Sequence, residues 1–148
     1  MNWTYTYEGF VYKVLNKACR VKDSSKITTL GAYSYALSDI LFNTCKNRVD
    51  INPSEFSKCW LFRGSGLTEK QIQEFRDLAK TRGKMRLYGY TSTSKQRSVA
   101  ESFAFSNKDS GIKRVLYCIH WEDAWSHYLM NGAFDYEEEI LLSDGAPF

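Results

Sequence analysis

The stretch Tyr136-Glu137-Glu138-Glu139-Ile140-Leu141-Leu142, near the C-terminus, decides which fold the sequence predicts. Side chains of a strand alternate between its two faces, so Glu137 and Glu139 share one face. The apolar residues that follow predict a strand buried on both faces, which would hold the two carboxylates rigidly at a sheet edge or cleft. Like charges held this close repel, and such pairs are typical of functional sites. A solvated acidic turn that enters a strand is the alternative for this motif alone.

The composition favours one globular domain over residues 1–148, because a chain of 148 residues is long enough to bury a full core. The 20 basic and 17 acidic residues give a net charge of +3 and form no basic block, so neither nucleic acid nor a membrane is an expected partner. Long apolar runs and a secretion leader are both missing from the sequence. We therefore expect a cytoplasmic protein, or a domain cut from a longer one.

The cysteines and histidines do not predict a metal site. The four cysteines are far apart and form no Cys-x-x-Cys pair: Cys19, Cys45, Cys59 and Cys118. In a domain of this kind, free buried thiols are expected. Cys118 and His120 would share a strand face, and His127 is nearby, but these three lack any recognised zinc spacing.

Apolar periodicity predicts helices mainly in the first third of the chain and strands in the remainder. The expected helices are Tyr7–Arg20, Leu30–Cys45, one from Thr68 to Gly83 that begins with a Thr-x-x-Gln capping box, and one capped by Ser94 or Ser98. The expected strands are Lys58–Gly64, stopped by a Gly-Ser-Gly turn, then Met85–Thr91, Arg114–Trp121 and the acidic strand, with 122–136 irregular. This order predicts an α+β domain.

Three predicted strand ends carry polar residues: Arg63, Ser92 and the pair Glu137 and Glu139. Taken singly, Arg63 could be an exposed arginine and the Ser-Thr-Ser run a helix cap. Taken together, three segments in order resemble the arginine-serine-glutamate class of mono-ADP-ribosyltransferases, found among bacterial toxins and eukaryotic ecto-enzymes. These segments are Leu61-Phe62-Arg63-Gly64, Tyr90-Thr91-Ser92-Thr93-Ser94 and Glu137-Glu138-Glu139, with a weaker match at Asn16-x-x-x-Arg20. The resemblance implies a split β-sandwich with helices preceding and flanking it.

The resemblance also implies roles for these residues toward NAD as co-substrate. Arg63 would grip the pyrophosphate with a forked, permanently charged donor. Gly64 would let the backbone approach the ligand, beside Ser92 and Thr93. Glu139 would stabilise the positive charge that builds on the ribose as the nicotinamide bond breaks. Ser92 would orient Glu139.

The acceptor follows from Glu137 in the same way. A carboxylate there can grip a guanidinium and help remove its proton, so Glu137 indicates arginine as the acceptor. The loop Leu129 to Tyr136 would face the protein substrate, with Phe134 or Tyr136 as an aromatic contact.

One segment departs from the pattern of the class, in which an aromatic residue stacks nicotinamide and a basic residue three positions later holds phosphate. Here Phe103 precedes Ser106 and Phe105 precedes Lys108, so only the second pair keeps a charge. Either aromatic could stack nicotinamide, or both could be core residues. The phosphate would be held by Lys108 or Arg20.

Three functions are compatible with these residues. The expected one is transfer of ADP-ribose from NAD to a protein arginine with release of nicotinamide. An NAD glycohydrolase, in which water is the acceptor, and an inactive domain that binds NAD or a partner protein are the alternatives.

Overall fold

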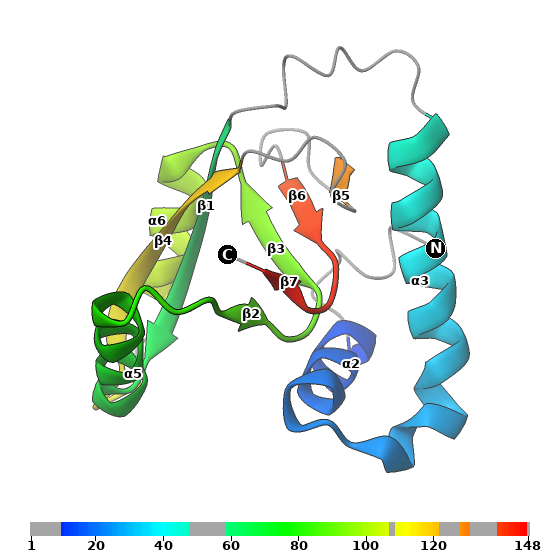
Figure 1. Ribbon diagram of the computed structural model, residues 1–148, viewed down its shortest axis with the longest axis horizontal. Helices are drawn as coiled ribbons and strands as arrows, with labels where there is room; N and C mark the ends of the chain where they lie inside the picture. The colour runs from blue at the N-terminus through cyan, green and yellow to red at the C-terminus, as the bar shows by residue number, and fades with distance from the viewer. Residues whose placement is uncertain (1–9, 48–58, 107–108, 122–127, 131–138, 148) are drawn as a thin grey trace.

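The computed structural model of the protein describes residues 10–47, 59–106, 109–121, 128–130 and 139–147 (Figure 1). The helices are α2 (Phe10–Val21), α3 (Ile27–Asn47), α5 (Glu69–Lys80) and α6 (Arg97–Ser106), with a 3-10 turn, η1, at Ser24–Lys26. The strands are β1 (Cys59–Leu67), β2 (Arg86–Leu87), β3 (Thr91–Ser94), β4 (Lys113–Trp121), β5 (Tyr128–Met130), β6 (Glu139–Leu142) and β7 (Ala146–Pro147). The fold is α+β, as the sequence predicts.

The described strands form two antiparallel sheets, and the larger one organises this part of the molecule. Its strand order is β4-β1-β3-β6-β5, while β2 and β7 form a separate two-stranded sheet. On one side of the large sheet, β1 and β4 pair continuously from Cys59 opposite Trp121 to Leu67 opposite Lys113. On the other side, β3 pairs with β6, and β6 pairs with β5.

Helices α2 and α3 pack against the β3–β6 half of this sheet. Their shared core consists of Leu15 from α2, Leu37 from α3, Tyr90 just before β3, and Leu141 from β6. Each of these four side chains is at most 2% exposed. The apolar residues that recur every three or four positions in the two helices therefore bury this half of the sheet, as expected of amphipathic helices.

The β1–β4 half is covered by α6 at very close range. A Cβ atom placed on Gly64 of β1 would lie 1.8 Å from the carbonyl oxygen of Ala100 and 2.5 Å from the amide nitrogen of Ala104. Both are backbone atoms of α6, so only glycine fits at this position. Alternation along β1 then places the Arg63 side chain on the face of the strand opposite α6.

The two halves meet at a single residue pair. Strands β1 and β3 are paired at Phe62 opposite Ser94, and from there they diverge, as Figure 1 shows. Since the ladder stops after one pair, the backbone groups beyond it need other partners. The divergence is the split that the sequence resemblance implies.

Several expected boundaries were wrong. The Gly-Ser-Gly segment is not a turn: β1 continues to Leu67, because Ser65 and Gly66 pair with β4. Arg63 consequently lies in the middle of β1 rather than at its exit. The expected strand Met85–Thr91 is broken at Gly89, whose φ of +84° interrupts extended backbone, and the Ser-Thr-Ser run lies inside β3. Residues 128–130, expected to be irregular, form β5.

Other expectations were confirmed. Thr68 caps α5, and the reciprocal capping box with Gln71 is formed. The Ser94 hydroxyl accepts a hydrogen bond from the Gln96 amide, 2.9 Å away, just before α6 begins. All four residues of β6 are buried, as a strand covered on both faces requires. No helix in the described part of the chain has the length and apolar character needed to cross a membrane.

The close approach at Gly64 can be tested by substitution. Gly64→Ala should lower the free energy of unfolding by about 3 kcal/mol, because the new methyl group would collide with the backbone of α6. Urea denaturation measures this directly. Gly31→Ala is the matched control: its Cβ would lie 3.4 Å from Ile27 in ordinary contact, and a mid-helix alanine should stabilise by about 0.5–1 kcal/mol. Equal effects of the two substitutions would contradict the packing account.

Candidate active site

The buried carboxylate of Glu139 is the centre of the site. Glu139 is the first residue of β6 and is only 7% exposed. In the register of β3 and β6, Ser94 is opposite Glu139 and Ser92 is opposite Leu141, so Ser92 and Glu139 lie diagonally on one face. The Ser92 hydroxyl donates a short hydrogen bond to Oε1 of Glu139. A carboxylate buried this deeply needs such a donor, because burial without one is strongly unfavourable.

The guanidinium of Arg63 reaches the same residue from the other half of the sheet. Its Nη1 donates to the main-chain carbonyl oxygen of Ser92 over 2.7 Å. Extending the β1–β3 register by two residues would place Gly64 opposite Ser92, but the strands have already diverged there. The Arg63 side chain therefore bridges the split at the point where the backbone ladder stops. Arg63, Ser92 and Glu139 thus form one connected chain of hydrogen bonds.

Each hydroxyl of the Ser-Thr-Ser run has a different partner. Ser92 contacts the carboxylate, and Thr93 donates to the carbonyl oxygen of Ile140 over 2.7 Å, which fastens β3 to β6. Ser94 supports the start of α6. The interpretation of this run as a helix cap therefore describes Ser94 alone.

A second layer of contacts holds β3 in place. The buried side chain of Asn16, on α2, donates from Nδ2 to the Tyr90 carbonyl oxygen over 3.0 Å. The Tyr90 hydroxyl donates to the Ser34 carbonyl oxygen at 2.7 Å and lies 2.5 Å from the Ser38 hydroxyl, both on α3. Just ahead, the Gly89 amide donates to the Asp144 carboxylate at 2.5 Å. Two helices and the chain after β6 therefore fix the approach to Ser92.

Tyr117, which the sequence did not single out, lies beside Arg63. The two residues are directly opposite in the β1–β4 ladder, so their side chains share a face. The ring of Tyr117 also contacts Phe75 of α5, with centroids 5.7 Å apart. Burial raises the pKa of Tyr117, and the charges of Arg63 and Arg20 partly offset this. Tyr117 is therefore a neutral phenol whose pKa is affected by the charges of both guanidinium groups.

Only the register could have identified Tyr117. It is one of ten tyrosines, and no local motif marks it. Its partner in the ladder, Arg63, is 54 positions away in the chain. Arg20, whose charge reaches the same phenol, is an exposed residue of α2. Its position is compatible with the expected contact to a phosphate.

Three further residues were expected to contact NAD: Phe103, Phe105 and Gly64. Phe103 and Phe105 on α6 are 46% and 62% exposed, and Arg114 lies 5.2 Å from the Phe105 ring centroid, so neither ring is a core residue. Gly64 has the packing role described above. The contacts of these three residues with NAD stay predictions.

Some expected site residues lie outside the described part of the chain: Glu137, Lys108, Phe134, Tyr136 and His127. Leu129 and Met130, at the start of the expected substrate loop, belong to β5 instead. Among the described residues, no three His, Cys, Asp or Glu side chains come together in a way that could hold a metal ion.

The geometry links the Glu139 carboxylate and the Arg63 guanidinium through Ser92. A carboxylate held by a hydroxyl on a rigid strand can stabilise positive charge that develops on a bound substrate. A guanidinium nearby can bind an anionic group of the same substrate. This combination suits a substrate that carries an anionic group and gains positive charge as it reacts.

A solved structure shows the same architecture. Vis toxin, an ADP-ribosyltransferase from Vibrio splendidus, matches with a TM-score of 0.63 and 17% sequence identity, covering 99% of this chain and 62% of the toxin chain. A structure of ADP-ribosyltransferase Vis in complex with the M6 inhibitor gives a TM-score of 0.44 at 16% identity, covering 99% of this chain and 71% of that one. The protein therefore has the ADP-ribosyltransferase fold.

The similarity is one of fold, and it has limits in length and sequence. The chain spans about three fifths of the length of the Vis toxin chain. No protein-family model matches the sequence, and no curated protein matches it either. A functional assignment therefore depends on the fold and on the Arg63–Ser92–Glu139 cluster together.

The Tyr90 anchor provides a stability test for the site's scaffold. Tyr90→Phe should lower the free energy of unfolding by about 1–2 kcal/mol, because it removes the hydroxyl that donates to the Ser34 carbonyl oxygen and contacts the Ser38 hydroxyl, both on α3. Tyr35→Phe, on the same helix that Tyr90 contacts, is the control: Tyr35 is 76% exposed, and its change should stay within about 0.5 kcal/mol. Thermal or urea unfolding distinguishes them. A Tyr90→Phe protein as stable as the control would refute the anchoring role.

Proposed function

We propose that this protein is a mono-ADP-ribosyltransferase that transfers ADP-ribose from NAD to an arginine side chain of a protein and releases nicotinamide. The observation that carries the proposal is the hydrogen-bonded series from Arg63 through Ser92 to the buried Glu139 carboxylate, in a chain with the ADP-ribosyltransferase fold. The Vis toxin, which shares this fold, is an ADP-ribosyltransferase. NAD use and arginine specificity are our extension to this chain.

In the proposed reaction, the bond between the ribose C1′ atom and the nicotinamide nitrogen breaks, and its electron pair leaves with nicotinamide. The ribose gains positive charge in the transition state, and the Glu139 carboxylate stabilises this charge while Ser92 keeps it oriented. Arg63, with Arg20 nearby, binds the pyrophosphate. An acceptor guanidinium nitrogen then bonds to C1′ and loses a proton, for which Glu137 is the proposed base.

Glu139 and Glu137 should have separable effects. Glu139→Gln should reduce both arginine transfer and NAD hydrolysis at least about a hundredfold, because the charge that stabilises the ribose is lost. Glu137→Gln should abolish transfer yet leave part of the hydrolysis. Labelled NAD with agmatine measures transfer, and nicotinamide release measures hydrolysis. Equal loss of both activities in Glu137→Gln would reject the division of roles, and a folded wild-type protein that does neither reaction would reject the function.

Ser92 should act through Glu139 as a positioning residue. Ser92→Ala should lower kcat about tenfold to a hundredfold with a smaller change in KM for NAD, because the carboxylate loses its fixed orientation. Ser92→Thr keeps the hydroxyl and should recover most of kcat. Steady-state nicotinamide release gives both constants. If the threonine variant were as inactive as the alanine variant, the hydroxyl would not be the important group.

A water acceptor is the second candidate. Product analysis separates the two functions, because a glycohydrolase would form free ADP-ribose at the same rate with or without an arginine acceptor.

A further inference from the structure

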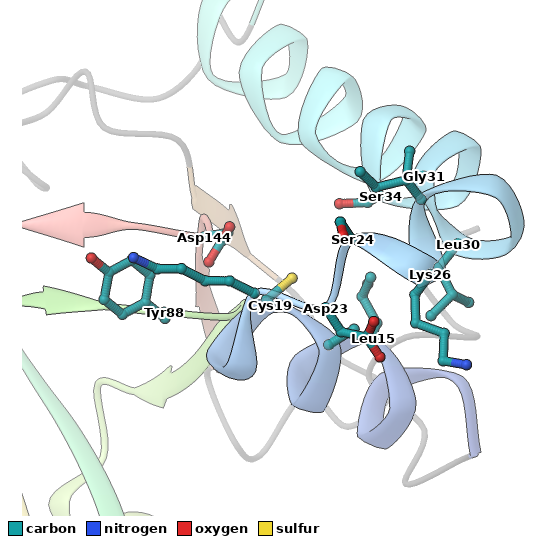
Figure 2. Close-up of a pocket in the computed structure, with 13 residues that line it drawn as sticks. Leu15, Cys19, Asp23, Ser24, Lys26, Leu30, Gly31, Ser34, Tyr88 and Asp144 are labelled. Carbon is teal, nitrogen blue, oxygen red and sulfur yellow. The ribbon is translucent and has the colours of Figure 1, made fainter.

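A cavity of about 410 Å³, open to solvent on one side, lies between helices α2 and α3 (Figure 2). Small-molecule sites typically have volumes of roughly 300–1,000 Å³. Its walls are mostly apolar: Leu15, Ala18 and Cys19 come from α2, and Ile27 and Leu30 come from α3. The three residues of the candidate active site do not line it. The proposed reaction therefore does not explain this cavity.

The positive and negative side chains around the cavity are equal in number, and three of them have partners within the protein. Two lysines and two aspartates line it. The ammonium group of Lys22 lies 4.9 Å from the centroid of the Tyr88 ring. Asp23 accepts hydrogen bonds from the amide and hydroxyl of Ser25. Asp144 accepts from the Gly89 amide. A ligand that carries a net charge would find no surplus of opposite charge here. An uncharged ligand loses little hydration free energy when it enters the cavity.

The cavity is also connected to the strand that carries Ser92. Ser34 lines it, and the Ser34 hydroxyl lies 3.1 Å from the Tyr90 hydroxyl. Asp144 lines it as well and binds the Gly89 amide, one residue before Tyr90. Figure 2 shows Asp144 and Tyr88 at one end of the cavity, with Leu30 and Gly31 of α3 at the other. An occupant would therefore touch the residues that brace the start of β3.

We propose that this cavity is a ligand site, separate from the Arg63–Ser92–Glu139 cluster, that binds a small uncharged, largely apolar molecule about the size of two or three rings. Burial of the rings against the apolar walls supplies the affinity. The proposal does not depend on the enzymatic function, since it concerns binding alone.

The dye N-phenyl-1-naphthylamine is a suitable probe, because it is uncharged and its fluorescence rises in apolar surroundings. We expect saturable binding to one site per chain. Its close analogue 8-anilinonaphthalene-1-sulfonate adds only a sulfonate and should bind at least about tenfold more weakly, because a buried charge would be uncompensated. Equal affinity for the two dyes, or no saturable binding, would overturn the proposal.

Substitution of Ala18 tests the location. Ala18→Phe should fill the cavity and weaken dye binding more than about tenfold. Ala32→Phe places the same ring on an exposed position of α3 that does not line the cavity, and it should leave binding unchanged. Thermal unfolding checks that both variants are folded. Equal binding by the two variants would overturn the assignment.

Cysteine alkylation tests the same site in the unmodified protein. Cys19 lines the cavity, whereas Cys118 is exposed on β4. Burial, reinforced by Asp144, raises the pKa of the Cys19 thiol, so mildly alkaline pH is needed for reaction with N-ethylmaleimide. At ten times its Kd, the uncharged dye should slow alkylation of Cys19 about tenfold and leave Cys118 unaffected. Alkylation of Cys19 at the same rate with and without the dye would overturn the proposal. Loss of the protection when saturating NAD is added would overturn the claim that the cavity is a separate site.

Discussion

The hydrogen bond between the Arg63 guanidinium and the Ser92 carbonyl oxygen is the contact on which the site depends. Strands β1 and β3 share one backbone pair and then diverge, and beyond that pair the Arg63 side chain links β1 to the backbone of β3. A side chain takes over where the backbone ladder ends. Because the same serine also holds the Glu139 carboxylate, the position of each charge in the site is linked to that of the other.

The surroundings of Glu139 explain why a buried negative charge is compatible with a stable fold. Its neighbours in β6 are apolar and fully buried, which makes the strand rigid but offers the carboxylate little solvation. The hydroxyl of Ser92 compensates in part by donating to the carboxylate, and the hydrogen bonds of Tyr90 and Asn16 hold the backbone just before β3 in place. Rigid support of this kind is what distinguishes a functional polar cluster from a surface ion pair.

Local sequence signals predicted the local features well and failed where distant segments decide the structure. The capping box at Thr68 and the buried strand from Ile140 to Leu142 depend on neighbouring residues, so their patterns were sufficient. The Gly-Ser-Gly segment has the composition of a turn, yet Gly64 is needed because the backbone of α6 lies against it. Tyr117 could not be found at all without the register of β1 and β4. The contact of Ser92 with Glu139 was anticipated only because the order of the motifs resembles a known class.

The single seam, which is the one residue pair at which the two halves of the sheet meet, also affects how sequences with this architecture can diversify. The core of α2, α3, β3 and β6 and the packing of α6 on β1 involve different residues, so a volume change in one does not require a compensating change in the other. Each half can accumulate substitutions independently, while the few positions at the seam must change together. A scaffold built in this way can retain the arrangement of Arg63, Ser92 and Glu139 even when little of the surrounding sequence remains the same.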